Sequence, residues 1–245
     1  MENGARRIEV GRVISESFSM YGANMAPLLT SAFVIFLISG ALQGFLNDEG
    51  GFILVTIGWI IAMIAQALYT GFVVTLVEDV RADGTRDMGA GEMLSSAQSS
   101  IPALIINSIL RGIGIGIGFI FLIVPGLILL TIWSLTSPAI VIEKTGAMGA
   151  FGRSYELVRG QAWQVFGVIV VAFLIAFGVS IVAALIGAAI GLAGVIILVI
   201  IAGILTAPIP ALVASILFFD LGGGGAAIAP AQPPTAPPAP PAATV

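Results

Sequence analysis

The sequence predicts an all-α fold, a polytopic bundle of transmembrane helices with about six spans arranged as three hairpins. Hydrophobic residues make up 58% of the chain and charged residues only 9%, and the mean hydropathy is +1.13. A soluble domain has about 25% charged residues, so much of this surface must face lipid. A lone strand in hydrocarbon would leave its backbone polar groups unsatisfied, so we expect every span to be a helix.

The charged N-terminal segment, residues 1–24, is predicted to stay in the mature protein and to include an interfacial helix. It carries Glu2, Glu9 and Glu16 and lacks a small-residue cleavage site, so it does not resemble a signal peptide. Residues 25–220 are predicted to form one membrane domain. Residues 221–245 are uncharged and rich in glycine, alanine and proline, which is typical of a disordered tail.

Long uncharged runs place the spans, because a helix needs about 20 apolar residues to cross about 30 Å of hydrocarbon. Two runs are too long for one crossing and must fold back. In the first, Pro125 and Gly126 predict a break, since proline interrupts a helix and glycine permits a turn. In the second, Gly187, Gly191 and Gly194 mark the expected reversal. The predicted spans are about 25–46, 52–77, 101–123, 127–142, 164–187 and 195–219.

With six spans, the basic residues outside the spans fall on one face of the membrane. The positive-inside rule makes that face cytoplasmic, so both termini are expected to be cytoplasmic. These residues are Arg6, Arg7, Arg12, Arg81, Arg86, Lys144, Arg153 and Arg159.

A short amphipathic segment precedes each pair of spans. Such segments favour helices that lie at the headgroup boundary, so the chain is interpreted as three repeats of an interfacial helix and a hairpin. The apolar stripes are Val10, Ile14, Phe18 and Tyr21; Leu94, Ala97 and Ile101; and Met148, Phe151, Tyr155 and Val158. Small residues are expected to bring the spans together, above all the overlapping GxxxG patterns of Gly112, Gly114, Gly116 and Gly118.

Composition excludes several kinds of chemistry. The chain has no cysteine and no histidine, which removes disulfides, Cys/His metal sites and imidazole catalysis. A net charge of −4 without a basic patch excludes nucleic acid as a partner. The acidic residues of the loop after residue 77 are interpreted as solvated, so no metal and no cofactor is expected. Those residues are Asp79, Asp83, Asp87 and Glu92.

Arg111 is the only charged residue inside a predicted span. It lies about ten residues into the third span, a depth of roughly 15 Å at helical rise. One interpretation makes Arg111 a contact for an ion, a lipid headgroup or a substrate, because charges within a membrane are costly. The other lets its side chain extend to the headgroups. Asn107, one turn earlier, is expected to share its environment.

A second group of candidates crowds the cytoplasmic ends of spans four and five. Arg153 and Arg159 are expected either to hold anionic headgroups, with Trp163 as an interfacial anchor, or to reflect ordinary membrane topology. The group consists of Pro138, Glu143, Arg153, Arg159 and Trp163.

Part of this group belongs to a pattern that resembles the bacterial glycerophosphoryl diester phosphodiesterase membrane-domain family. The opening stretch IEVGRVISESFSMYGANMAPLL and the stretch LIVPGLILLTIWSL are also similar to that family, over residues 8–220 as a whole. Ile132 departs from it, since many relatives have a basic residue there. The pattern consists of Trp133, Ser134, Pro138, Glu143, Ala150, Arg153, Ser154, Leu157, Gly160 and Trp163.

The resemblance implies a multi-pass protein of the bacterial cytoplasmic (inner) membrane, of largely unassigned role. The catalytic domain that follows in some relatives relies on histidines, which this chain lacks. We therefore expect a non-enzymatic membrane scaffold or lipid-interacting module, and a small-molecule or lipid transporter or channel is the alternative. Membrane lipids are the expected partners, and an unidentified membrane protein is a second option.

Overall fold

The computed structural model describes residues 8–48 and 51–223. Within these ranges the chain forms helices α1 to α11 and no strand, so the predicted all-α class is confirmed. The N-terminal residues Arg6 and Arg7 and nearly all of the predicted tail lie outside the described residues.

Six helical stretches among the described residues are long and apolar enough to cross a membrane, and the protein is accordingly a multi-pass membrane protein. Lipid is the solvent that such stretches require, because they bury only a minor part of their apolar surface inside the protein. These stretches are Met25–Leu42, Phe52–Ala82, Ile101–Phe121, Ile123–Val141, Ala162–Ile190 and Leu192–Asp220.

The first hairpin consists of α2 (Met25–Asp48) and α3 (Phe52–Asp83). Helix α3 continues six residues beyond the predicted end of the second span. It ends at Gly84, whose φ of 86° is left-handed and whose N–H donates to the carbonyl of Val80. Glycine adopts this conformation without steric cost, which explains the sharp end of the helix.

The second hairpin consists of α5 (Ile101–Phe121) and α6 (Ile123–Ile132), followed by the short α7 (Thr136–Val141). The chain turns at Leu122, so the break predicted at Pro125 and Gly126 is wrong. Proline is tolerated in the first turn of a helix, where its missing N–H would have no helical partner. Pro125 occupies that turn of α6.

The third hairpin consists of α9 (Ala162–Ile190) and α10 (Leu192–Thr206), and α11 (Pro208–Asp220) continues α10 after a break at Ala207. The reversal occurs at Gly191, with φ 112°, within the glycine region that predicted it. Prolines at the start of α11 account for the break, because proline removes a helical hydrogen bond.

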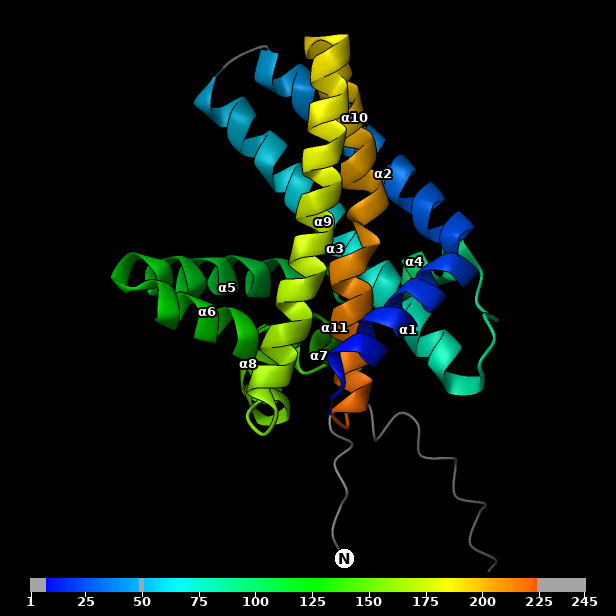
Figure 1. Ribbon diagram of the computed structural model, residues 1–245, viewed down its shortest axis with the longest axis vertical. Helices are drawn as coiled ribbons and strands as arrows, with labels where there is room; N and C mark the ends of the chain where they lie inside the picture. The colour runs from blue at the N-terminus through cyan, green and yellow to red at the C-terminus, as the bar shows by residue number, and fades with distance from the viewer. Residues whose placement is uncertain (1–7, 49–50, 224–245) are drawn as a thin grey trace, which may run out of the picture.

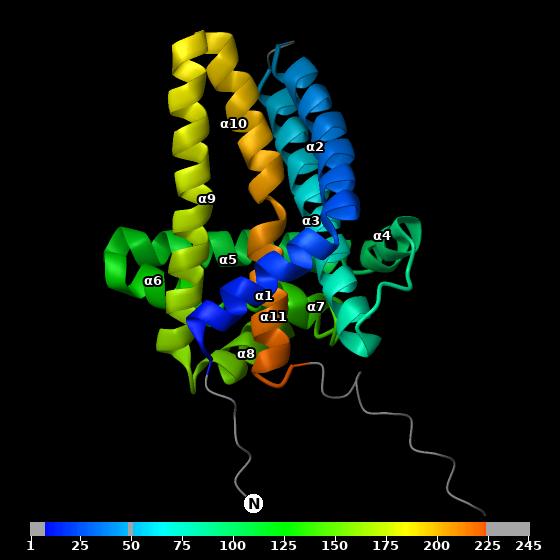
Figure 2. The same cartoon turned by 45° about the vertical axis from the view of Figure 1, so that its right-hand side comes forward.

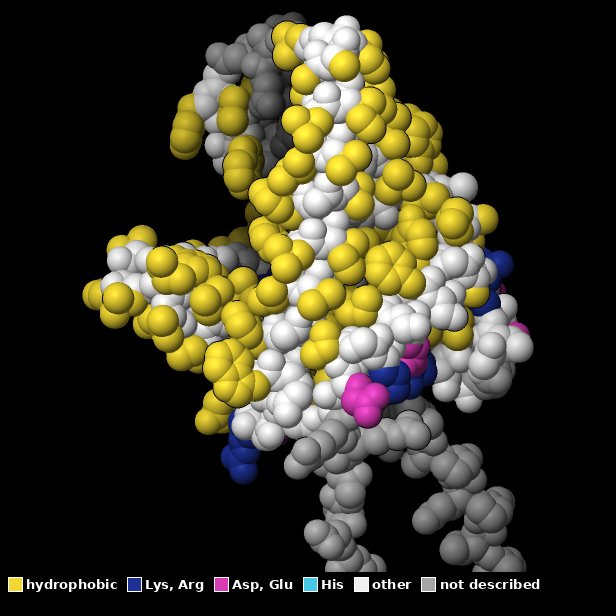
Figure 3. Space-filling view, viewed as in Figure 1, with side chains coloured by type: hydrophobic (Ala, Val, Ile, Leu, Met, Phe, Trp, Pro, Cys, Tyr) yellow, Lys and Arg dark blue, Asp and Glu magenta, His cyan; other side chains and the backbone are white. Residues whose placement is uncertain are grey.

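The hairpins do not run parallel to one another (Figures 1 and 2). Helices α9, α10 and α11 stand upright, α2 and α3 lean against them, and the α5–α6 hairpin extends sideways, across the direction of α9, in both views. The charged side chains visible in Figure 3 lie toward the lower end. We call this the charged end and define it by the ion-paired residues Arg12, Arg81 and Asp220.

Helices α1 (Val10–Ala23), α4 (Ala90–Gln98) and α8 (Gly146–Val158) precede the three hairpins, as the repeat predicts. Their packed faces overlap only in part with the predicted stripes, for Ala97 and Val158 of the stripes are buried. Helix α8 buries Ala150, Ser154 and Val158, while Met148 and Tyr155 of the predicted stripe are exposed.

The protein core lies toward the charged end, where α3, α7 and α11 meet (Figure 1). The largest fully buried side chains there come from the second half of α3, from the start of α7 and from α11. They include Tyr69, Phe72, Leu76, Leu135, Ile140, Leu212, Leu217 and Phe218.

Candidate functional site

A cavity of about 430 Å³ borders this core, between α3, α5, α6, α7, α9 and α11. Ligand-binding pockets have volumes of about 300–1,000 Å³, so this one is large enough for a small molecule or part of a lipid. Three sequence-separated parts of the chain form it, which is why no single motif predicts it.

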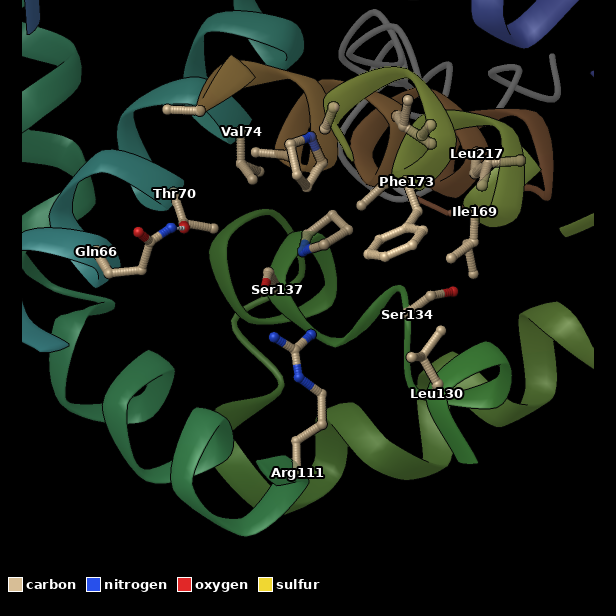
Figure 4. A pocket seen from close by; sticks show the side chains of 18 of the residues that line it. Gln66, Thr70, Val74, Arg111, Leu130, Ser134, Ser137, Ile169, Phe173 and Leu217 are labelled. Carbon is tan, nitrogen blue, oxygen red and sulfur yellow. Dashed lines mark hydrogen bonds between the residues drawn. The ribbon is translucent and has the colours of Figure 1, made fainter. Parts of the chain in front are cut away.

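Arg111 projects from α5 into this cavity (Figure 4). Its Nη1 lies 3.5 Å from the hydroxyl of Thr136, the outer limit for a hydrogen bond. None of the ion pairs among the described residues includes Arg111. The guanidinium therefore enters the cavity with most of its donors available.

Hydroxyl and amide groups surround this guanidinium (Figure 4). Ser134, in the link between α6 and α7, has a buried hydroxyl without a hydrogen-bond partner among the described residues. Ser137 of α7 lines the cavity as well. On the side formed by α3, the Nε2 of Gln66 donates to the hydroxyl of Thr70 at 3.4 Å. Buried polar groups are rarely left unsatisfied in native proteins, so Ser134 marks a place where a ligand atom or water fits.

The remaining walls are apolar. Leu130 of α6, Ile169 and Phe173 of α9, and Leu217 of α11 face the cavity (Figure 4). The cavity thus combines one cation and a few hydroxyls with hydrocarbon walls. This combination suits an amphiphile with a negatively charged or strongly polar group.

Asn107 does not share the environment of Arg111. Its side chain is only 2% exposed, and its Nδ2 donates to the carbonyl of Ala147 in α8 at 2.9 Å. Asn107 therefore fastens α5 to α8, and it does not line the cavity.

The second group of candidates separates into three parts. Arg153 binds Glu143 through two hydrogen bonds of 2.7 and 2.9 Å, and this bonding raises the pKa of Arg153. Pro138 is buried and lines the cavity. Arg159 is exposed, and Trp163 is 80% exposed next to Phe166. The ion pair holds the loop after α7 against α8, so its contribution is structural.

A cluster of four charged residues at the charged end was missed in the sequence. Asp220 accepts a 2.5 Å hydrogen bond from Arg12 and lies 3.7 Å from Arg81, and Glu16 pairs with both arginines. The hydrogen bond to Asp220 is the main reason that the pKa of Arg12 is raised. Two signals pointed here: the i,i+4 spacing of Arg12 and Glu16, and Asp220 as the sole charge after Arg159.

The acidic residues from the end of α3 to the start of α4 bond to the backbone of this segment. Asp79 accepts from the N–H groups of Asp87 and Met88 at 3.0 and 3.1 Å, and Glu92 accepts from Gly89 at 2.8 Å. Within the part of the chain that the structure describes, no three acidic side chains come together as a metal site would require.

A family model described as a domain of unknown function, DUF7847, matches residues 19–186, more than half of the chain. The chain belongs to the DUF7847 family. No curated protein and no solved structure matches it. The description of DUF7847 names no activity, and it does not test the resemblance to the phosphodiesterase membrane domains.

The DUF7847 match covers most of the cavity. It includes Arg111, Ser134 and Ser137 as well as the cavity-facing residues of α3 and α9. It ends before α10 and α11, so the wall that contains Leu217 and the charged cluster around Asp220 lie partly beyond it.

Proposed function

We propose that this DUF7847 protein is a non-enzymatic lipid-interacting module that holds an anionic amphiphile in the Arg111 cavity. The observation that carries the proposal is the guanidinium without an acidic partner in a cavity with largely apolar walls. A phosphate or a carboxylate at the polar end of a lipid is the class of group that fits it.

The charge of Arg111 is the first support. An unpaired charge away from water costs several kcal/mol, on the order of what a counterion can offset. Arginine binds phosphate and carboxylate in a bidentate manner. The hydroxyls of Ser134 and Ser137 add two donors on the same side of the cavity.

The hydrocarbon walls are the second support. Transfer of an acyl chain from the surrounding lipid to the side of Ile169 and Phe173 would cost little free energy, because both environments are apolar. The anionic group therefore provides the specificity, while the apolar part of the ligand contributes shape.

We further propose that the protein lies in a bacterial cytoplasmic membrane with the charged end on the cytoplasmic side. Support comes from the basic residues outside the spans, which the positive-inside rule assigns to the cytoplasm, and from the family resemblance of the sequence. Arg159 and Trp163 are suited to the headgroup region, because both are exposed near the start of α9.

A transporter remains the second candidate, since Arg111 would also serve an anion pathway. It has less support than binding, because Asn107, the other residue proposed for such a pathway, bonds to α8 instead of lining the cavity.

The first prediction concerns Arg111→Gln, tested in nanodiscs of phosphatidylcholine with a minority of phosphatidylglycerol. Native mass spectrometry counts the phosphatidylglycerol molecules retained by the protein. Hydrogen bonds to charged groups contribute about 1.5–3 kcal/mol, so we expect retention to weaken by about tenfold to a hundredfold. Phosphatidylcholine retention should not change.

Arg159→Gln is the matched control, because it removes an exposed arginine from the same protein. It should leave the tightly retained phosphatidylglycerol in place. Equal retention by Arg111→Gln and the unaltered protein would contradict the proposal, provided that both have the same thermal stability. Phosphate flux into proteoliposomes that depends on Arg111 would favour the transporter.

A further inference from the structure

We propose that the α5–α6 hairpin does not cross the membrane but lies in its plane, within the leaflet next to the charged end. The exposed apolar surface of the hairpin would then bind the acyl chains of that leaflet, and four helical stretches would cross. This inference concerns the hairpin alone and does not rest on the proposed ligand.

The direction of the membrane normal follows from the upright helices. Helix α9 has 29 residues and is therefore about 43 Å long, more than the about 30 Å of the hydrocarbon. It extends from the charged end to the opposite end, where Gly191 turns the chain back (Figures 1 and 2). A helix of this length and composition crosses the bilayer along its own axis.

Helix α5 extends across that direction (Figures 1 and 2). Figures 1 and 2 differ by a rotation about the vertical axis, and α5 is horizontal in both, so it gains little height along α9. Length and apolar composition qualify α5 as a span. Its orientation relative to α9 is what separates it from the other spans.

Helix α6, in contrast to α5, is too short to cross the hydrocarbon. Its ten residues reach about 15 Å, half of the hydrocarbon. The chain then bends at Trp133 and Ser134 before α7. Helix α7 has six residues, and Ala139, Ile140 and Val141 are buried in the protein, so it does not extend α6 into lipid.

Three contacts fasten the hairpin to α8, which lies at the charged end. Asn107 of α5 donates to the carbonyl of Ala147. At the end of α6, the hydroxyl of Ser154 donates to the carbonyl of Ile132 at 2.7 Å. Trp133 packs edge-on against Phe151 with ring centroids 4.9 Å apart. These contacts join the base of the hairpin to α8, so the base lies beside the charged end.

The free surface of the hairpin needs hydrocarbon. At its tip, Ile120, Phe121 and Ile123 are 82%, 77% and 68% exposed. Protein covers the side of the hairpin that faces α8, so the acyl chains of one leaflet are the partner that fits the other sides. In this orientation Arg111 lies at the same depth in the membrane as the rest of α5. The depth of roughly 15 Å, which assumes that α5 crosses the membrane, then does not apply.

The test uses the absence of cysteine from the chain. The tripeptide Ser-Cys-Ser is inserted between Leu122 and Ile123 and, as the matched control, between Gly191 and Leu192. Glu156→Cys, at an exposed position of α8, reports the charged end (Figure 1). A membrane-impermeant maleimide is applied to right-side-out and to inverted vesicles.

We expect the insertion at Leu122 to react from the same side as Glu156→Cys, or only after detergent is added. Either result would show that the tip of the α5–α6 hairpin does not reach the membrane face at Gly191. Reaction from the side that labels the insertion at Gly191 would overturn the proposal.

A second measurement needs no insertion. A nitroxide on Leu122→Cys is compared with one on Leu192→Cys for collisions with oxygen and with a water-soluble nickel complex. We expect frequent collisions with oxygen and few with the nickel complex at residue 122, because the tip lies in hydrocarbon. Collisions with the nickel complex as frequent at residue 122 as at residue 192 would contradict this placement.

Discussion

At the scale of single residues, Asp220 connects the first and the last of the described helices, α1 and α11. It is 7% exposed and binds Arg12 of α1, while Arg81 of α3 lies next to it and over the ring of Phe219. Three helices therefore meet at one carboxylate. Removal of one partner from a largely buried ion pair leaves the other charge uncompensated, which is strongly destabilising.

We accordingly expect Asp220→Asn to lower the free energy of unfolding by about 1.5–3 kcal/mol. Unfolding in mixed micelles, followed by circular dichroism, measures this change. Glu156→Gln is the control, because Glu156 is 66% exposed and lies 3.8 Å from Arg153. A loss of stability in the control as large as that in Asp220→Asn would show that position 220 has no special role.

Arg111 illustrates how far single residues can be predicted. Its charge within an apolar run was enough to select it, because such charges are costly in lipid. Its surroundings were not predictable. Ser134 lies in a bend before α7 and Ser137 lies in α7, whereas the sequence predicts one continuous span over both. Arg153 was selected too, but Glu143 already pairs with it.

At the scale of elements, α1 and α8 bury small polar residues together with apolar ones. Ser17 of α1 and Ser154 of α8 face the protein, while Phe18 and Tyr155 are 43% and 49% exposed. Large apolar side chains gain nothing from burial in protein when lipid is the alternative, and small residues permit close packing. The packed side of α1 therefore combines small residues with large apolar ones such as Met20.

Glycine pairs in α5 follow the same principle. A Cβ on Gly114 would lie 2.5 Å from the Trp133 ring, and one on Gly118 would lie 3.0 Å from the Cα of Gly126. Gly112 and Gly116 have nothing within 4 Å. One of the two overlapping GxxxG patterns packs against α6 and the following bend, and the other contributes no contact.

The α9–α10 hairpin provides a test of this close packing. In Gly187→Ala the new methyl group would lie 2.5 Å from the Cα of Val195. Because a backbone atom cannot move aside as a side chain can, we expect a loss of about 1–3 kcal/mol in unfolding free energy. Unfolding in mixed micelles, followed by circular dichroism, measures this change in free energy.

Gly178→Ala is the control on the same helix, with nothing within 4 Å of the new methyl group. Alanine is the better helix former by about 1 kcal/mol, so this variant should be neutral or more stable. Equal destabilisation by both substitutions would contradict the packing at Gly187.

At the scale of the whole molecule, the protein divides into a packed part and a lipid-solvated part. Buried side chains gather where α3, α7 and α11 meet, and large apolar residues are exposed along the outer parts of the hairpins. The three tryptophans lie in different parts of the protein and differ in exposure. Trp59 and Trp163 are 67% and 80% exposed, whereas Trp133 packs against Gly114 and Phe151.

Single-tryptophan variants, with the other two replaced by phenylalanine, should therefore differ in quenching by brominated phosphatidylcholine. We expect strong quenching of Trp59 and at least several-fold weaker quenching of Trp133, because contact with bromine requires exposure to lipid. Steady-state fluorescence in liposomes measures both. Comparable quenching of Trp133 and Trp59 would place the Trp133 ring in lipid, against the packing described.

The sequence alone determined that this protein is helical and passes a membrane several times, because apolar runs and scarce charges leave few other solutions. It also located the turn at Gly191 and selected Arg111. Only the tertiary structure decided the sideways direction of the α5–α6 hairpin, the cavity around Arg111 and the partners of Asp220. Hydropathy measures affinity for lipid, but it carries no information about direction or about which small and polar groups meet across helices.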